Sequence, residues 1–226
     1  MNKIASTVSA VVLVAVFVTF SDVAFAPVLQ TSKALAAETK KRHPGKRLYL
    51  RRTCLACHGR GGVRAIQDYP NIAGQPEKYL VRQIRDILSG KRVGGEDKAG
   101  AMRTQPMVGA LVTADGKVRL SDEEIRQIAS WLSQQPPAEP VPLEAALTEI
   151  QIRDARALYK KKCRACHGKG ALKPLKGYPV IAGQRKAYII AQVHDVKDRI
   201  RRNGKIKTMY PMVRKLTDEQ IDLLAS

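Results

Sequence analysis

The short motif Cys-x-x-Cys-His occurs twice in this chain and constrains its fold more than any other feature. The first copy runs from Cys54 to His58, and the second runs from Cys163 to His167, 109 residues later. These two motifs contain all 4 cysteines of the 226-residue chain. Thiols three positions apart lie on one face of a helical turn, so each pair forms a local cluster with its adjacent histidine.

Three kinds of site use such clusters. Covalent haem attachment joins both thiols to one porphyrin edge, and the adjacent histidine reaches the iron. Two Cys-x-x-Cys pairs with histidines can instead hold zinc, and one pair in a β-α-β setting can act as a redox dithiol. No β-α-β pattern is present, and the fixed histidine favours haem. The predicted attachment residues for two haem c groups are Cys54, Cys57, Cys163 and Cys166, with His58 and His167 as iron ligands.

The duplication extends beyond the cysteines. The segment Tyr-Pro-x-Ile-Ala-Gly-Gln occurs at residues 69–75 and again at 178–184, with the same offset of 109. Apolar residues then recur at helical spacing in each copy. They are Leu80, Ile84, Ile87 and Leu88 in the first copy, and Ile189, Val193, Val196 and Ile200 in the second. The spacing predicts one amphipathic helix per copy.

Each copy closes with a signal for the start of a helix. Ser121 precedes Glu124, and Thr217 precedes Gln220, with an apolar run after each pair. This is the capping-box pattern. We also expect helices before the cysteine pairs, at residues 45–53 and 152–162. Neither copy contains a convincing strand, so the predicted fold class is all-α: two tandem small helical domains, each wrapped around one haem.

A proline-rich segment predicts the domain boundary. Four prolines lie between residues 136 and 142, which favours an extended, semi-rigid connection. We therefore assign residues 37–133 to the first domain, 134–144 to a linker and 145–226 to the second domain. The first closing helix continues into Trp131 and beyond, whereas the second stops at Ser226. We expect a shorter C-terminal helix in the second domain.

The N-terminal residues 1–36 indicate export. Lys3 precedes an apolar run of 17 residues, from Ile4 to Phe20, and a small-residue site at Ala34–Ala36 suits cleavage after Ala36. Because 17 residues is at the short limit for a membrane span, an uncleaved anchor is the alternative. We expect a periplasmic protein that is soluble or loosely membrane-associated.

Composition adds two constraints. Aromatic residues make up 5% of the chain, so two small domains lack large apolar side chains, and a bound haem would supply that missing core surface. The net charge of +20 is spread over both halves. Such a field steers acidic partners toward the protein. Export argues against nucleic acid as the partner.

From about residue 44 to residue 226, the chain resembles the dihaem class I c-type cytochromes of the cytochrome c4 type. The resemblance is carried by both Cys-x-x-Cys-His motifs, both Tyr-Pro-x-Ile-Ala-Gly-Gln segments and both Met-to-Leu-Ser/Thr-Asp-Glu closing segments. It implies two tandem cytochrome c domains, a periplasmic location and electron transfer.

The resemblance also implies a methionine as the sixth iron ligand. In the second domain Met209 has the family's spacing from the closing helix, and Met212 is the alternative. In the first domain an insertion at residues 112–118 disturbs the spacing. Met107, beside an apolar run like the family's, is preferred there, with Met102 as the alternative.

The resemblance gives a role to two prolines as well. Pro70 follows His58 by 12 residues, and Pro179 follows His167 by the same distance. In the family, a proline carbonyl at this place accepts a hydrogen bond from the Nδ1–H group of the haem histidine. Such a bond fixes the ring orientation and makes the iron ligand more basic. The same prolines also suit turns.

The predicted function is to shuttle single electrons between redox partners, with no substrate chemistry. The expected partners are acidic redox proteins, among them a membrane-bound oxidase or dehydrogenase. The alternative is a haem subunit of an oxidoreductase, or such an enzyme itself, for example a peroxidase or a sulfur-compound dehydrogenase. An enzyme would need an open or displaceable iron ligand, whereas a pair of six-coordinate haems would not bind carbon monoxide.

Overall fold

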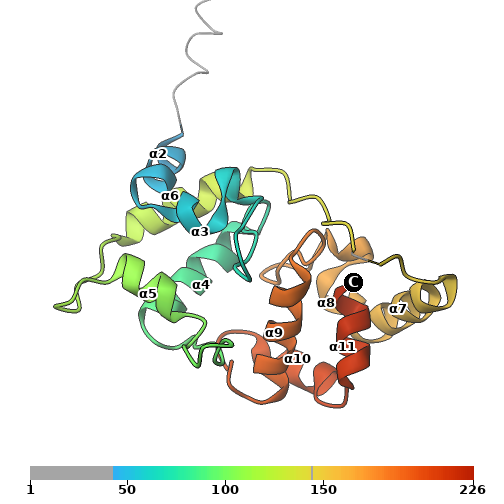
Figure 1. Cartoon of the computed structure of the whole chain (residues 1–226). Helices are drawn as coiled ribbons and strands as arrows, with labels where there is room; N and C mark the ends of the chain where they lie inside the picture. Colours follow the sequence, from blue (N-terminus) through green and yellow to red (C-terminus); the bar gives the residue numbers. More distant parts are fainter. Residues whose placement is uncertain (1–42, 144) are drawn as a thin grey trace, which may run out of the picture. The chain divides into compact units, whose positions relative to one another are not determined.

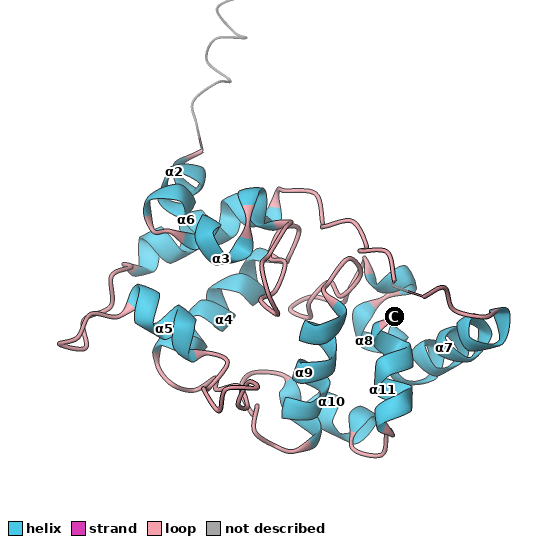
Figure 2. Ribbon diagram, in the orientation of Figure 1, coloured by secondary structure: helices cyan, strands magenta, loops and turns pink. Residues whose placement is uncertain are grey.

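Two halves of the chain repeat the same order of helices (Figures 1 and 2). The computed structural model describes residues 43–143 and 145–226. These residues belong to one compact unit. The predicted signal at residues 1–36, with its cleavage site, lies outside the described residues. Within the described parts of the chain, no helix combines the length and apolar character needed to cross a bilayer.

The helices of the two repeats correspond one to one. The first repeat contains α2 (Pro44–Arg51), α3 (Cys54–His58), η1 (Arg60–Gly62), α4 (Glu77–Leu88), α5 (Gln105–Leu111) and α6 (Asp122–Ser133). The second repeat contains α7 (Glu149–Lys162), α8 (Arg164–His167), η2 (Lys169–Ala171), α9 (Lys186–Lys197), α10 (Ile206–Val213) and α11 (Asp218–Ala225). The described residues contain no strand, only isolated bridges at Glu96–Met102 and Val112–Val118. The all-α prediction is confirmed.

Capping boxes start the closing helices, as their sequences predict. The Ser121 hydroxyl accepts a hydrogen bond from the Glu124 N–H at 3.2 Å, and the Glu124 carboxylate accepts one from the Ser121 N–H at 2.9 Å. Thr217 and Gln220 make the same pair at the start of α11. A further capping box joins Thr148 and Gln151 at the start of α7. This box was not predicted, although Thr-x-x-Gln before an apolar residue fits the pattern.

The first repeat has its own apolar core. Helix α6 packs on α2 and α4, and the rings of Tyr49 and Trp131 lie with centroids 5.0 Å apart. The buried residues of this core are Leu48, Tyr49, Leu80, Ile84, Leu111, Leu120, Ile125, Ile128, Ala129, Trp131 and Leu132. Three of the four residues of the predicted stripe on α4, Leu80, Ile84 and Ile87, are buried.

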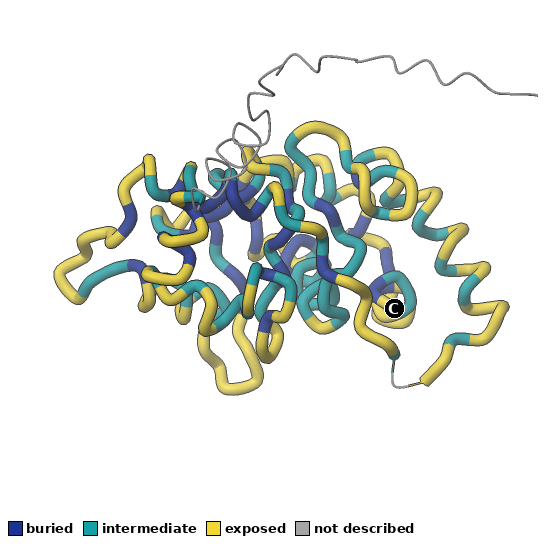
Figure 3. Tube along the Cα trace, turned by 90° about the horizontal axis from the view of Figure 1, so that it is seen from above, coloured by how far each residue is buried: buried dark blue, intermediate teal, exposed yellow. Residues whose placement is uncertain are grey.

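The core of the second repeat is much smaller. Its buried residues are Val196, Val213, Leu216 and Ile221, and none of the residues of α7 is buried. In Figure 3 this repeat, which ends at the C-terminal label, is drawn mainly as half-buried and exposed. The prediction that Ile200 continues the stripe on α9 is wrong. The helix ends at Lys197, the backbone turns at Arg199 with a φ of 59°, and Ile200 is exposed.

The crossing of α2 and α6 requires a glycine at position 45. A Cβ atom there would lie 1.9 Å from the Gln127 carbonyl oxygen and 2.8 Å from the Trp131 Cβ. We expect Gly45→Ala to push the two helices apart and to lower the free energy of unfolding by about 1–3 kcal/mol. Urea unfolding followed by circular dichroism measures this change.

Gly109→Ala is the matched control for Gly45→Ala. Gly109 lies in α5, where an added Cβ meets nothing within 4 Å. Alanine in place of glycine inside a helix gains up to about 1 kcal/mol. Equal destabilisation by the two substitutions would contradict the close approach of α2 and α6.

Candidate functional site

Each Cys-x-x-Cys-His motif forms a short helix that ends in a glycine turn. After α3, Gly59 has a φ of 72°, and a Cβ there would lie 2.1 Å from the Arg64 carbonyl oxygen. After α8, Gly168 has a φ of 77° and a similar clash with Lys173. Only glycine fits both the left-handed backbone and the close approach. The turn brings the chain back beside the histidine.

A tyrosine from the preceding helix fixes each turn. The Tyr49 hydroxyl donates to the Gly59 carbonyl at 2.6 Å, and the Tyr159 hydroxyl donates to the Gly168 carbonyl at 2.7 Å. This role of the two tyrosines was not predicted. The recurrence of a tyrosine five or four residues before each cysteine pair was the available signal. These bonds tie α2 and α7 to the motifs that follow them.

Both histidines are held by backbone carbonyls. His58 Nδ1 lies 2.9 Å from the Pro70 oxygen, and His167 Nδ1 lies 3.0 Å from the Pro179 oxygen. Because a carbonyl only accepts, Nδ1 must carry the proton, which leaves the Nε2 lone pair free for a metal. Burial lowers the pKa of both histidines, and the carbonyl bonds offset part of that shift. Both rings are therefore neutral at physiological pH.

The first cysteine of each pair is not activated as a redox thiol. All four are free, and burial raises the pKa of the Cys54 and Cys163 thiols to about 11. Reactive dithiols depend instead on a lowered pKa. Among residues 43–143 and 145–226, no group of three or more His, Cys, Asp or Glu side chains is placed to hold a metal ion. The two pairs therefore do not assemble the tetrahedral site that zinc needs.

Both motifs line one cavity of about 1590 Å³. Pockets for one small ligand measure about 300–1,000 Å³, so this cavity has room for more than one large group. The apolar lining residues include Leu80, Ile84, Leu111, Leu120 and Ile128 from the first repeat, and Ile181, Ile189, Val193, Ile206 and Leu216 from the second. A thiol pair, a neutral histidine with a free Nε2 and an apolar wall meet in each repeat. This donor set fits haem c.

The four candidate methionines lie in different environments. Met107 on α5 is half-buried, contacts the first core and lines the cavity. Met102 is 37% exposed and is not among the residues that line the cavity. Met209 on α10 is half-buried against the second core and lines the cavity. Met212 also lines it but is 38% exposed. The surroundings favour Met107 and Met209 as the sixth ligands.

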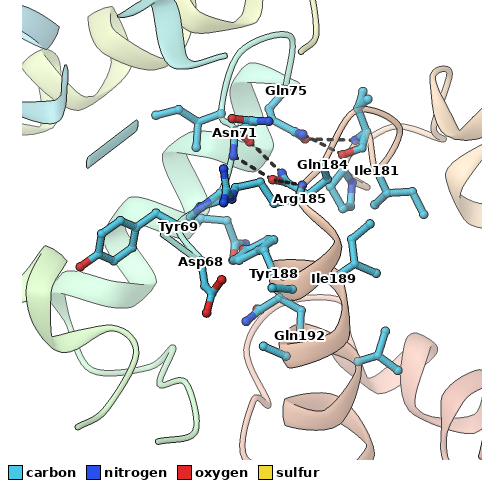
Figure 4. Close-up of a pocket in the computed structure, with 18 of the residues that line it drawn as sticks. Asp68, Tyr69, Asn71, Gln75, Ile181, Gln184, Arg185, Tyr188, Ile189 and Gln192 are labelled. Carbon is cyan, nitrogen blue, oxygen red and sulfur yellow. Dashed lines mark hydrogen bonds between the residues drawn. The ribbon is translucent and has the colours of Figure 1, made fainter. Parts of the chain in front are cut away.

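Polar side chains join the two repeats. Figure 4 shows Gln75 and Gln184, the last residues of the repeated segments, reaching from one repeat to the other. No role was predicted for these glutamines, although both occupy the same position in the repeat. Each makes two hydrogen bonds to backbone of the opposite repeat. These contacts were not predicted, because they join positions 105 to 113 residues apart.

A buried arginine pair adds to this contact. Arg92 donates to Gln83 at 2.9 Å and to Gln192 at 3.1 Å, and Arg201 donates to the same two amide oxygens at 2.8 and 2.6 Å. Both arginines line the cavity and are less than a tenth exposed. Their residue numbers differ by 109, so the two arginines occupy matching positions in the repeat, and this match was the available sequence signal for the pair.

Comparisons with known proteins agree with this geometry. The family model described as Cytochrome c matches residues 43–136. The family model described as Cytochrome C oxidase, cbb3-type, subunit III matches residues 150–226.

Similar proteins match across both repeats. The thiosulfate dehydrogenase electron acceptor of Thiomonas intermedia (strain K12) is 31% identical over 180 residues, 76% of this chain and 76% of the relative. Cytochrome c4 of Azotobacter vinelandii is 30% identical over 180 residues, 76% of this chain and 81% of the relative. The crystal structure of reduced recombinant cytochrome c4 from Pseudomonas stutzeri matches with a TM-score of 0.62 and 28% identity, covering 80% of this chain and 94% of that one.

Proposed function

The chain belongs to the cytochrome c4 family of dihaem c-type cytochromes, and from this premise we propose that it carries single electrons between redox partner proteins without transforming a substrate. It has two cytochrome c domains with one haem c in each. Haem iron supplies reversible one-electron oxidation and reduction. The observation that carries the proposal is the cavity, where both cysteine pairs, both neutral histidines and a half-buried methionine from each repeat meet.

In each repeat, different residues attach the haem, bind its iron and orient the histidine ligand. We assign covalent attachment to Cys54 and Cys57 in the first repeat and to Cys163 and Cys166 in the second. His58 and His167 bind iron through Nε2, and the Pro70 and Pro179 carbonyls hold the rings in that orientation. A hydrogen bond at Nδ1 also makes the ligand more basic.

Methionine closes the remaining coordination position. We assign this role to Met107 and Met209, because both are half-buried at the cavity wall. A thioether ligand raises the reduction potential of a haem. It also leaves no open position for a substrate or a peroxide. The assignment therefore supports electron transfer rather than peroxidase chemistry.

The partners follow from charge and from the similar proteins. The net charge of +20 suits acidic redox proteins, and steering by charge weakens as salt is added. One relative is described as a thiosulfate dehydrogenase electron acceptor. We include a dehydrogenase of a small sulfur compound among the proposed electron donors. Export to the periplasm, through residues 1–36, is also part of the proposal.

Binding of carbon monoxide to the reduced haems distinguishes an electron carrier from an enzyme. The chain is produced in a host that matures c-type cytochromes, and extraction with acidified organic solvent is expected to leave two haems per chain bound to the protein. After reduction, the optical spectrum at neutral pH is expected to stay unchanged under carbon monoxide, because Met107 and Met209 would occupy the remaining ligand position of each iron. Rapid binding at either haem would favour the enzymatic alternative. Loss of colour to the solvent would overturn covalent attachment.

A further inference from the structure

The contact between the repeats involves the same peptide groups that hold the haem histidines. Pro70 offers its carbonyl to His58, and the N–H of that same peptide group belongs to Asn71. This N–H donates to Gln184 Oε1 at 2.8 Å, across the interface. Pro179 and Val180 form the matching peptide group in the second repeat, whose N–H donates to Gln75 Oε1 at 3.0 Å.

The orientation of both glutamine amides is set by their partners. Gln184 Nε2 donates to the Asn71 carbonyl at 2.8 Å, and Gln75 Nε2 donates to the Val180 carbonyl at 2.7 Å. A backbone N–H only donates and a backbone carbonyl only accepts, so each side-chain oxygen must face the N–H. Each glutamine therefore binds one backbone residue of the opposite repeat at two points (Figure 4).

A peptide group transmits polarisation from its N–H to its carbonyl oxygen. The nitrogen and the carbonyl are conjugated through the partial double bond of the peptide. When the N–H donates a hydrogen bond, the carbonyl oxygen of the same peptide group therefore becomes a stronger acceptor. Hydrogen bonds linked in this way strengthen one another by about 10–30% per bond. The effect is largest away from water, and Asn71, Gln75 and Val180 are each 5–6% exposed.

We propose that Gln184 tunes the haem of the first repeat and that Gln75 tunes the haem of the second, each through the opposite repeat's histidine. The proposal rests on the assignment of His58 and His167 as iron ligands. In the first relay, His58 donates to Pro70, and the same peptide group donates to Gln184. In the second, His167 donates to Pro179, and that peptide group donates to Gln75. Both glutamines are positioning residues.

The relay has a predictable sign. A stronger carbonyl acceptor takes more of the Nδ1 proton and makes Nε2 a better donor to iron. A better donor stabilises ferric over ferrous iron and lowers the reduction potential. Loss of Gln184 is therefore expected to raise the potential of the haem bound by His58, although Gln184 belongs to the other repeat. The same loss is expected to weaken the hydrogen bond at His58 Nδ1–H, which a contact that only packs the repeats together does not require.

Of the two reciprocal variants, Gln184→Met is expected to disturb the interface between the repeats less than Gln75→Met. Methionine matches the length of glutamine but offers no amide. The Asn71 side chain still donates to the Gly183 carbonyl at 3.0 Å, which holds the two segments together. Val180 has no such side-chain contact, so Gln75→Met removes more of the interface. The control is Tyr188→Phe, which removes the 2.8 Å hydrogen bond from Arg92 across the interface without contacting either proline peptide.

The test follows each haem separately. Haem methyl signals of the oxidised protein, assigned to each repeat by nuclear magnetic resonance, are followed in a redox titration. Gln184→Met is expected to change the ferric-to-ferrous equilibrium of the His58 haem by about 1.3- to 4.6-fold toward ferrous. This range is 10–30% of a hydrogen bond to a charged group, here the imidazole when it is bound to ferric iron. At 59 mV per tenfold it equals about 7–39 mV. The His58 Nδ1–H signal of the reduced protein is expected to move upfield.

The relay predicts that the two glutamine variants shift the potentials of different haems. Gln75→Met is expected to shift the potential of the His167 haem instead. Tyr188→Phe changes the cavity wall without contacting a proline peptide, and it is expected to leave the Nδ1–H signals of His58 and His167 in place. Equal shifts of both haems, a shift of the haem in the substituted repeat, or no shift would each overturn the relay. If the unsubstituted chain carries no covalent haem or loses histidine ligation, the proposed function fails instead. The two failures are therefore distinguishable.

Discussion

Replacing Cys163 and Cys166 with alanine is expected to halve the covalent haem of the chain and to unfold the second repeat. The buried side chains of that core are Val196, Val213, Leu216 and Ile221, and the apolar residues packed around them are only partly buried. A domain of this size with so few buried side chains cannot offset its conformational entropy unaided. The haem face supplies the missing apolar surface, and without thioether bonds the haem is not retained.

The first repeat provides the matched comparison. Cys54→Ala with Cys57→Ala removes the other haem, but α2 and α6 still bury Tyr49, Trp131 and Leu132 against each other. We expect this variant to keep more of its helical signal and more resistance to protease than the Cys163 and Cys166 variant. Haem is counted by the pyridine haemochrome spectrum, and helix content by far-ultraviolet circular dichroism. Equal loss of structure in the two variants would contradict the unequal cores.

Met209→Leu is expected to lower the reduction potential of the second haem by on the order of 100 mV, within the roughly 0.8 V range that axial ligands span. Leucine keeps the packing against the second core, where Met209 is half-buried, but it offers no sulfur. Loss of the thioether removes the ligand that raises the potential. The weak near-infrared band of methionine-ligated ferric haem is expected to fall by half, and the reduced variant is expected to bind one carbon monoxide.

Met212→Leu is the control for this assignment. Met212 is one helical turn away on α10 and is 38% exposed. Its replacement is expected to leave the band, the potential and the resistance to carbon monoxide unchanged. If Met212→Leu abolishes the band and Met209→Leu does not, the ligand is Met212. Met107→Leu and Met102→Leu make the same comparison for the first haem.

The features that depend on residues close together in the sequence were predictable. The cysteines and the histidine of each motif lie within five residues, so the motif itself predicts a haem site. Capping boxes at Ser121 and Thr217 begin α6 and α11, as their local spacing predicts. Repetition at an offset of 109 predicted two similar helical domains, and the matched family models bear this out.

Other features depend on the path of the chain between distant segments. Met102 and Met107 lie five residues apart, and the insertion at residues 112–118 disturbs the spacing that would distinguish them. The fold of the segment before α5 leaves Met102 exposed and Met107 at the cavity. The end of α9 before Ile200 follows from the turn at Arg199.

The sequence alone determines that this chain forms two helical domains built on haem-attachment motifs, because thioether chemistry and helix initiation depend on neighbouring residues. Only the tertiary structure decided which methionines reach the cavity and how Gln75 and Gln184 meet the histidine-bound peptides of the opposite repeat. Those contacts join segments more than 100 residues apart. They form only after both repeats have folded and packed together.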